Sequence, residues 1–151
     1  MSYIRYKNNN LFVENVSVRR LASKLSTPFY LYTEGNIIEN YKSFSNNFKK
    51  SKPLICFSVK ANSNIQILKV LKKMGSGADV VSGGELLKAI KSGIKPNKIV
   101  FSGVGKTEDE IKLAIRKNIL LINVESENEA ILINKIAGKK KKKIAIGIRL
   151  N

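Results

Sequence analysis

The chain has 151 residues, of which 28 are Lys or Arg and 11 are Asp or Glu, so its formal net charge is +17. Hydrophobic residues make up 43% of the chain, which is enough for a domain with a packed core and argues against wholesale disorder. Because histidine is absent, these residues cannot supply a His-ligated zinc site, a Ser-His-Asp triad or a histidine general base.

The sequence shows no membrane or export signal. It has no apolar run of roughly 18 residues, and its first ten residues lack the apolar stretch of a secretory signal. The single cysteine, Cys56, excludes an intrachain disulfide and fits a reducing compartment. We therefore expect a cytoplasmic protein with no membrane partner and no metal site.

The basic charge has a compositional explanation. Of the 28 basic residues, 23 are Lys and 5 are Arg, whereas base reading and bidentate phosphate contacts favour Arg. Asn (16) and Ile (19) are also abundant, which indicates a biased genome rather than a selected binding face. The dense cluster at 139–143 lies between a helical pattern and an apolar run, as a solvated loop does. We expect no nucleic-acid partner.

The chain begins with a segment that differs from the rest. Residues 22–32 predict a short helix, a turn at Thr27-Pro28 and a short strand. Residues 36–48 predict an amphipathic helix. Its apolar side is formed by Ile37, Ile38, Tyr41, Phe44 and Phe48.

From residue 53 onward, short apolar runs alternate with helical patterns. The runs are rich in β-branched residues and bounded by turn formers, which predicts strands at 53–59, 78–81, 99–102, 120–124 and 144–148. Apolar residues at helical spacing predict helices around 65–72, 86–90, 111–115 and 130–137.

The junctions between these elements carry helix-capping signals. In three places a Ser or Thr is followed three residues later by Glu, the pattern of a capping box. The three pairs are Ser82 with Glu85, Thr107 with Glu110, and Ser126 with Glu129. Glycines suited to a left-handed cap close three of the helices. They are Gly75, Gly93 and Gly138.

A β-loop-α unit recurring about every 20 residues predicts an α/β fold with a parallel sheet. Such a sheet is either an open, doubly wound sheet or a closed (β/α)8 barrel. No G-x-G-x-x-G opens the first helix, and the strands are short and evenly spaced, so we favour the barrel. A complete barrel needs roughly 250 residues. We therefore expect residues 31–151 to be the first part of a barrel and residues 1–30 to belong to a second substructure.

Lys60 differs from the other lysines because it directly follows the strand predicted at 53–59. The carboxyl ends of parallel strands carry the active sites of α/β proteins. Side-chain alternation places Lys60 on the face of Cys56 and Ser58. Partial desolvation there favours a neutral, nucleophilic amine, as Schiff-base chemistry requires. The alternative is a strand-end lysine whose amine reaches solvent.

Lys60 lies in the first of five motifs that follow one another along the chain. They are FSVKAN (57–62), GADVVSGGEL (77–86), IVFSGVGKT (99–107), NVES (123–126) and IRLN (148–151). Together they resemble the group IV pyridoxal-phosphate-dependent decarboxylases of alanine-racemase-like fold, and among them the diaminopimelate decarboxylases. The resemblance covers about residues 11–151. Ser58 departs from it, since the family usually has Ala or Pro there, but a small serine is compatible with the strand.

The resemblance implies a fold, a cofactor and a set of site residues. The fold is a partial barrel that binds pyridoxal 5'-phosphate, with the N-terminal segment contributing to a second β-domain. Lys60 is implied to be catalytic and to hold the cofactor, and Asp79, Arg149 and Glu85 to bind it. Asp79 and Arg149 are expected on neighbouring parts of the barrel beside Lys60. Glu85 and Ser82 also have a complete explanation as a helix cap.

The implied activity is decarboxylation of meso-diaminopimelate to L-lysine by a homodimer. Gly103 and Gly105 are interpreted as turn glycines, because the family binds phosphate with later glycine-rich loops. The family's cofactor-stacking histidine, its Glu-Pro-Gly-Arg segment and a late Cys and Tyr are expected after Asn151. We therefore expect the 151 residues alone to be inactive.

Three alternatives remain at this point. The first is another substrate for the same fold, such as ornithine, arginine or carboxynorspermidine, or an alanine racemase. The second is a non-catalytic, single-barrel protein that carries pyridoxal phosphate, against which the extension before residue 31 argues. The third is an inactive basic fragment that binds nucleic acid.

Overall fold

The structure is a computed structural model and describes residues 3–48 and 50–150. The chain divides into two compact units between Asn47 and Phe48. Within the described residues, every helix falls short of the length and apolarity needed to cross a bilayer.

The first unit begins with an antiparallel sheet that the sequence analysis did not predict. Its strands are β1 (Ile4–Lys7), β2 (Asn10–Val13) and β3 (Val16–Ser17), in the order β1-β2-β3. Asn8 and Asn9 join β1 to β2 with φ angles of 48° and 56°. Two left-handed residues form the two-residue hairpin turn whose twist matches that of the strands, and Asn tolerates that conformation well.

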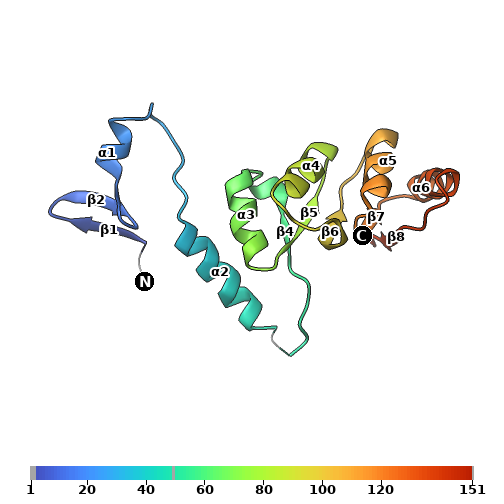
Figure 1. Ribbon diagram of the computed structural model, residues 1–151, viewed down its shortest axis with the longest axis horizontal. Coiled ribbons are helices and arrows are strands. Elements are labelled where there is room, and N and C mark those ends of the chain that lie inside the picture. Colours follow the sequence, from blue (N-terminus) through green and yellow to red (C-terminus); the bar gives the residue numbers. More distant parts are fainter. Residues whose placement is uncertain (1–2, 49, 151) are drawn as a thin grey trace. The chain divides into compact units, whose positions relative to one another are not determined.

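Two helices follow the sheet in this unit (Figure 1). They are α1 (Val18–Ala22) and α2 (Glu34–Asn46). The short helix predicted from residue 22 onward is misplaced, because α1 ends at Ala22, whereas α2 matches the predicted amphipathic helix. The short strand predicted after the Thr27-Pro28 turn, up to residue 32, is wrong, because residues 29–33 are irregular. The Gly35 amide donates to Glu14 Oε1 at 2.8 Å and so ties the start of α2 to the sheet.

The second unit contains a five-stranded parallel sheet in the order β4-β5-β6-β7-β8. The strands are β4 (Cys56–Ser58), β5 (Gly77–Val80), β6 (Ile99–Phe101), β7 (Leu121–Val124) and β8 (Ala145–Ile148). Each strand pairs with the next along the chain, without the reversal that defines a doubly wound sheet. The order is therefore that of a barrel segment, as predicted.

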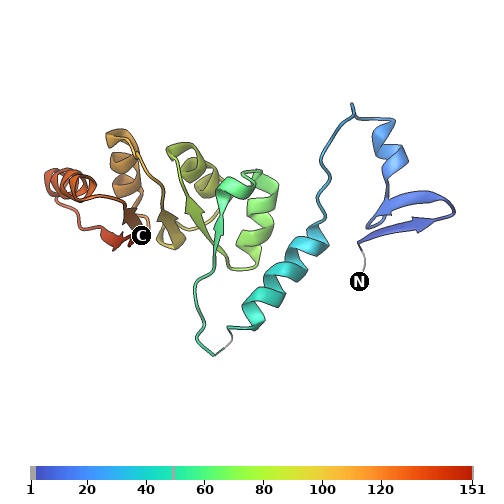
Figure 2. The same cartoon turned by 180° about the vertical axis from the view of Figure 1, so that it is seen from behind.

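A helix follows each of the first four strands, as Figures 1 and 2 show from opposite sides. The helices are α3 (Ile65–Lys73), α4 (Gly83–Lys91), α5 (Glu108–Lys117) and α6 (Glu127–Lys139). Two 3-10 turns complete the unit, η1 (Val59–Ala61) and η2 (Pro96–Lys98). All five strands and four helices predicted from residue 53 onward are confirmed.

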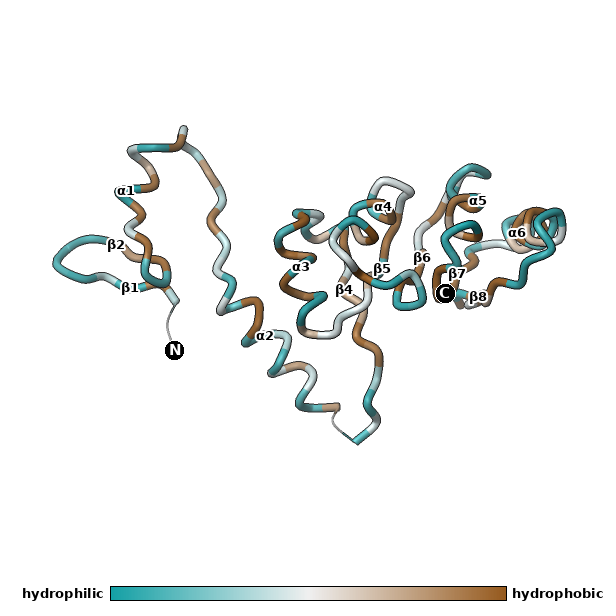
Figure 3. Tube along the Cα trace, in the orientation of Figure 1, coloured by the Kyte–Doolittle hydropathy of each residue, from teal (hydrophilic) through white to brown (hydrophobic). Residues whose placement is uncertain are grey.

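The two faces of this sheet differ sharply. Alternate residues on one face, such as Val80, Phe101 and Ile122, are fully buried among the apolar sides of the helices. Figure 3 shows hydrophobic segments on both the strands and the helices of this unit. The other face carries small or polar residues that stay partly accessible, including Ser58 and Asp79. The core therefore lies between sheet and helices, and polar chemistry is left for the opposite face.

The helix caps follow the prediction with local differences. Thr107 and Glu110 form a reciprocal capping box. Ser82 and Ser126 also cap their helices, but the Glu partner of each accepts from the residue before the cap. Gly75 and Gly93 have positive φ as predicted, whereas Gly138 lies within α6 and Lys141 takes the left-handed position instead.

The lysine cluster at 139–143 forms the end of α6 and a mostly exposed loop, as expected. Lys142 is the exception. Its Nζ lies 2.7 Å from Asn118 Oδ1 and 3.4 Å from the carbonyl oxygens of Ile115 and Arg116. A cation at the C-terminus of α5 is favoured by the helix dipole, so Lys142 has a structural role.

Gly77 shows why a residue without a side chain begins β5. A Cβ at this position would collide with the Lys98 carbonyl oxygen and lie 2.8 Å from Cys56 Sγ. We expect Gly77→Ala to lower the free energy of unfolding by about 1–3 kcal/mol, because backbone would have to move. Gly138→Ala is the control, since a Cβ there meets nothing within 4 Å. Urea denaturation of both variants should show a loss at Gly77 alone.

Glu110 links two neighbouring βα units. Its Oε1 accepts from the Gly83 amide at 2.8 Å and its Oε2 from the Thr107 amide at 3.0 Å. These hydrogen bonds favour the charged form, so the Gly83 amide and then the Thr107 amide lower the pKa of Glu110 below its ordinary value of 4.5.

This lowered pKa makes stability depend on pH. The stabilisation is fully present above pH 4.5 and is lost as the pH falls through the lower folded value. We expect the stability difference between wild type and Glu110→Gln to be large at neutral pH and to shrink in acid. Urea denaturation at several pH values measures it. Glu108→Gln, which removes an exposed carboxylate of the same helix turn, is the matched control variant.

Candidate active site

A row of polar side chains crosses the accessible face of the parallel sheet at the carboxyl ends of its strands. Parallel strands present these ends at one edge, where α/β proteins place their active sites. The row consists of Lys60 after β4, Asp79 in β5, Ser102 after β6, Asn123 in β7, Glu125 after β7 and Arg149 after β8.

Lys60 lies at the expected end of β4, but in the 3-10 turn η1 rather than on the strand. Phe57 and Val59 pack into the core on the helix side, as alternation predicts. The Lys60 side chain is exposed in the described structure, not partly desolvated as expected. Its amine is therefore accessible to a ligand.

Asp79 accepts a hydrogen bond from a neighbouring strand. Ser102 Oγ donates to Asp79 Oδ1 at 2.5 Å, and Asn123 Nδ2 donates to Ser102 Oγ at 2.9 Å. The three residues come from β5, the end of β6 and β7, which are adjacent in the sheet. Sequence reasoning singled out Asp79 and missed its two partners, although both lie within the motifs that carry the family resemblance.

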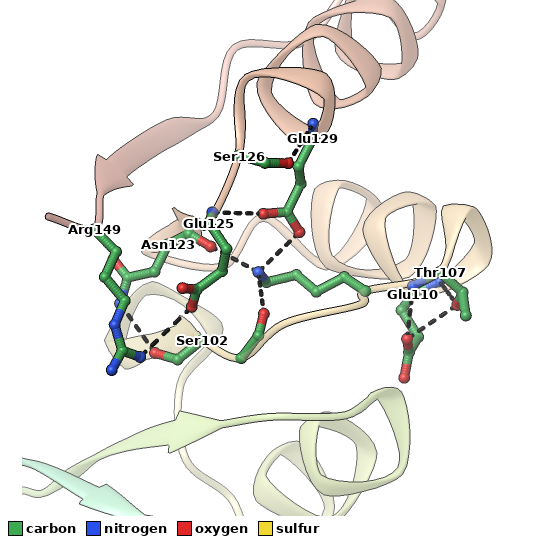
Figure 4. A network of polar contacts seen from close by, with 10 residues as sticks. Ser102, Thr107, Glu110, Asn123, Glu125, Ser126, Glu129 and Arg149 are labelled. Atoms are coloured by element: carbon green, nitrogen blue, oxygen red, sulfur yellow. Dashed lines mark hydrogen bonds and ion pairs between the residues drawn. The ribbon is translucent and has the colours of Figure 1, made fainter. Parts of the chain in front are cut away.

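Arg149 pairs with Glu125 and not with Asp79. Arg149 Nη1 lies 3.6 Å from Glu125 Oε1, and Figure 4 shows the two side chains facing each other. The expectation that Asp79 and Arg149 lie on neighbouring parts of the barrel is wrong, because three strand-to-strand steps separate β5 from β8.

Glu125 has an unusual environment. Its side chain is 12% exposed, and Oε1 is buried with no hydrogen-bond partner among the described residues. A buried carboxylate oxygen without a hydrogen bond is costly. This oxygen is therefore an acceptor that a donor outside the described residues can satisfy.

Lys106 is a further residue that sequence reasoning missed. Its side chain is 1% exposed and its Nζ donates to the carbonyl oxygens of Gly103 and Asn123, each at 2.7 Å, and to Glu129 Oε1 at 2.9 Å. All three protons of the ammonium thus have an acceptor. Its role is structural: it holds the loop after β6 against β7.

The remaining predicted residues have local structural explanations. Glu85 Oε2 accepts from the Val81 amide at 2.9 Å, and Ser82 Oγ accepts from the Glu85 amide at 3.2 Å. Gly103 and Gly105 have φ angles of 96° and 70°, so they are turn glycines as interpreted.

Cys56 lies on the accessible face near Asp79 and is half-buried. Burial first, and the Asp79 carboxylate second, raise the pKa of its thiol. The thiol therefore stays protonated at neutral pH and is a poor nucleophile. Cys56 fills space in the sheet, as a small apolar residue does.

Comparisons with known proteins point to one family. The family described as "Pyridoxal-dependent decarboxylase, pyridoxal binding domain" matches residues 34–151. Diaminopimelate decarboxylase of Aquifex aeolicus is 46% identical over 99% of this chain, and that of Haemophilus influenzae is 40% identical over 100%. The chain spans about a third of their length, 35% and 36% respectively.

A solved structure is similar over nearly all of the chain. Diaminopimelate decarboxylase from M. jannaschii in complex with L-lysine is 37% identical, with a TM-score of 0.92. The similarity covers 97% of this chain and 35% of that one. The parallel sheet and its helices thus have the architecture of the N-terminal part of that enzyme.

Proposed function

This chain belongs to the family of pyridoxal-dependent decarboxylases, and we propose on that premise that the whole protein decarboxylates meso-diaminopimelate to L-lysine. The observation that carries the proposal is Lys60, an accessible amine at the carboxyl end of β4, at one end of the polar row. The named relatives, similar across the full chain, support the choice of substrate.

The residues present fit pyridoxal phosphate. Lys60 offers the primary amine that an aldehyde requires, on an exposed side chain just after the carboxyl end of β4. Asp79 and Arg149 add charges of opposite sign along the same row. Among residues 3–48 and 50–150, the buried Glu125 Oε1 has no hydrogen-bond donor, as expected of a site completed by other groups.

The cofactor, when bound, supplies the electron sink for the bonding pair left behind as carbon dioxide departs. Lys60 would hold the cofactor through its Nζ, the primary amine that the cofactor's aldehyde requires. The same Nζ would carry a proton for the reaction when it is not bonded to the cofactor. Asp79 and Arg149 balance charge beside the cofactor. For Glu85, we assign the cofactor contact to Oε1, because Oε2 already accepts from the Val81 amide.

The larger assembly is also part of this proposal. Residues 31–151 contribute the first part of a (β/α)8 barrel, and residues 1–30 contribute the sheet β1-β2-β3 to a second β-domain. The whole protein acts as a cytoplasmic homodimer. The 151 residues alone should release no carbon dioxide, because β4 and β8 each have only one neighbouring strand among the described residues.

The test uses the protein expressed from its complete gene and loaded with pyridoxal phosphate. Carbon dioxide release is measured from meso-diaminopimelate and, separately, from ornithine and arginine. We expect turnover of meso-diaminopimelate with L-lysine as product. Faster turnover of ornithine or arginine would assign another substrate to the same fold, and a protein that binds no pyridoxal phosphate would overturn the proposal.

A further inference from the structure

We propose that Ser102 and Asn123 are positioning residues that hold the Asp79 carboxylate in place for the reaction. They form a hydrogen-bonded relay across three adjacent strands, from Asn123 through Ser102 to Asp79. The inference rests on the proposed function and goes beyond it, because it assigns roles to two residues that do not themselves need to touch the cofactor.

The relay has a fixed direction. A serine hydroxyl carries one proton. Because the Asn123 amide donates to Ser102 Oγ at 2.9 Å, the hydroxyl proton is free to point at Asp79 Oδ1, 2.5 Å away. Among the described residues, Ser102 is the only side chain that donates to the Asp79 carboxylate. The relay therefore decides which way the carboxylate faces.

The far end of the relay is held by two further features. The Asn123 carbonyl oxygen accepts from the buried Lys106 Nζ at 2.7 Å, which holds the backbone of β7. Gly147 pairs with Asn123 across β7 and β8, and a Cβ at Gly147 would lie 2.5 Å from Asn123 Oδ1. A glycine at this position thus leaves room for the amide, whose nitrogen then reaches Ser102.

The arrangement differs from a helix cap or a packing contact. In the helix caps of this unit, a side chain accepts from a backbone amide. The amide belongs to the same β-α junction or to the neighbouring one. The relay instead joins side chains only, on the accessible face, and ends on a charged group. Hydrogen bonds to charged groups are the strong ones, so the relay is well suited to hold a carboxylate against a competing partner.

The experiment uses the holoenzyme expressed from the complete gene. The variants are Ser102→Ala, which removes the link, and Asn123→Asp, which replaces the donor with an acceptor of the same shape. Ser102→Thr keeps a hydroxyl. Asn134→Asp, on the exposed side of α6, controls for the added negative charge. Each variant is measured for kcat and KM, for the dissociation constant of pyridoxal phosphate from apo-protein, and for its thermal unfolding midpoint.

We expect Ser102→Ala and Asn123→Asp to raise the cofactor dissociation constant and to lower kcat, each by about tenfold, the effect of losing one hydrogen bond to a charged group. KM should change little. Ser102→Thr should keep the cofactor dissociation constant and kcat close to those of wild type, because it retains the hydroxyl. Asn134→Asp should match wild type in both.

Double variants separate a positioning role from a structural one. If Ser102 acts through Asp79, Ser102→Ala should add nothing in an Asp79→Asn background, whereas a general packing defect would add its effect there too. Additive losses, or wild-type cofactor affinity and kcat in both single variants, overturn the inference while the proposed function stands. Failure of the wild-type protein to bind pyridoxal phosphate overturns both.

Discussion

Lys60→Ala, made in the protein expressed from its complete gene, is expected to abolish decarboxylation, with kcat falling on the order of 10³-fold or more. The amine of Lys60 is the proposed covalent attachment point for the cofactor, and no other side chain in the polar row is an amine. The visible absorbance of the lysine-bound cofactor should disappear at the same time. Stopped assays of carbon dioxide release and an absorbance spectrum measure the two effects.

The matched control is Lys69→Ala, which removes another exposed lysine in the same unit, on helix α3. It should keep both the activity and the spectrum of wild type. Folding should be intact in both variants, because Lys60 is exposed and its removal leaves no buried group without a partner. Substantial activity in Lys60→Ala would contradict the assignment of the cofactor attachment site.

Among the variants proposed for this chain, Lys106→Met is expected to cause the largest loss of stability. It should lower the free energy of unfolding by about 3–5 kcal/mol. The methionine fits a site of similar length but leaves Glu129 without its cation, and it removes the donor that Lys106 provides to the carbonyl oxygens of Gly103 and Asn123. Removing one partner of a buried ion pair costs more than the pair contributes, because the other charge remains in a poorly solvated place. Urea denaturation monitored by circular dichroism measures the change.

Lys112→Met is the control for this prediction. Lys112 also pairs with two carboxylates, Glu108 at 2.9 Å and Asp109 at 3.3 Å, but its side chain is 44% exposed. Water and salt screen such a pair, so its removal should leave stability close to that of wild type. If both variants lose the same free energy of unfolding, burial is not the reason that Lys106 stabilises the fold.

The β-α succession was predictable because its signals are local. Each strand in the second unit has its own β-branched run, and each helix has its own cap and apolar spacing. Hydrogen bonds within one β-α junction, such as Ser82 to the Glu85 amide, follow from residues three apart. The antiparallel strands before residue 18 were not predicted, although the Asn8-Asn9 turn that joins β1 to β2 is also a local signal.

The pairing of site residues was not predictable in the same way. Asp79, Ser102 and Asn123 are more than 20 residues apart in sequence, and so are Lys106 and Glu129. Which of them meet depends on strand order and register, since one step along a strand moves a side chain to the other face. The expected proximity of Asp79 and Arg149 failed for this reason, because the order of the sheet places β6 and β7 between their strands.

By itself, the sequence determined the α/β class, the order of elements from residue 53 onward and the position of Lys60 at the carboxyl end of a strand, because these depend on periodicity and on neighbouring residues. The tertiary structure alone decided that Ser102 and Asn123 serve Asp79, that Glu125 faces Arg149 and that Lys106 is a buried clamp. The physical reason is that hydrogen bonds and ion pairs act over a few ångströms, and only the sheet brings these distant residues within that range.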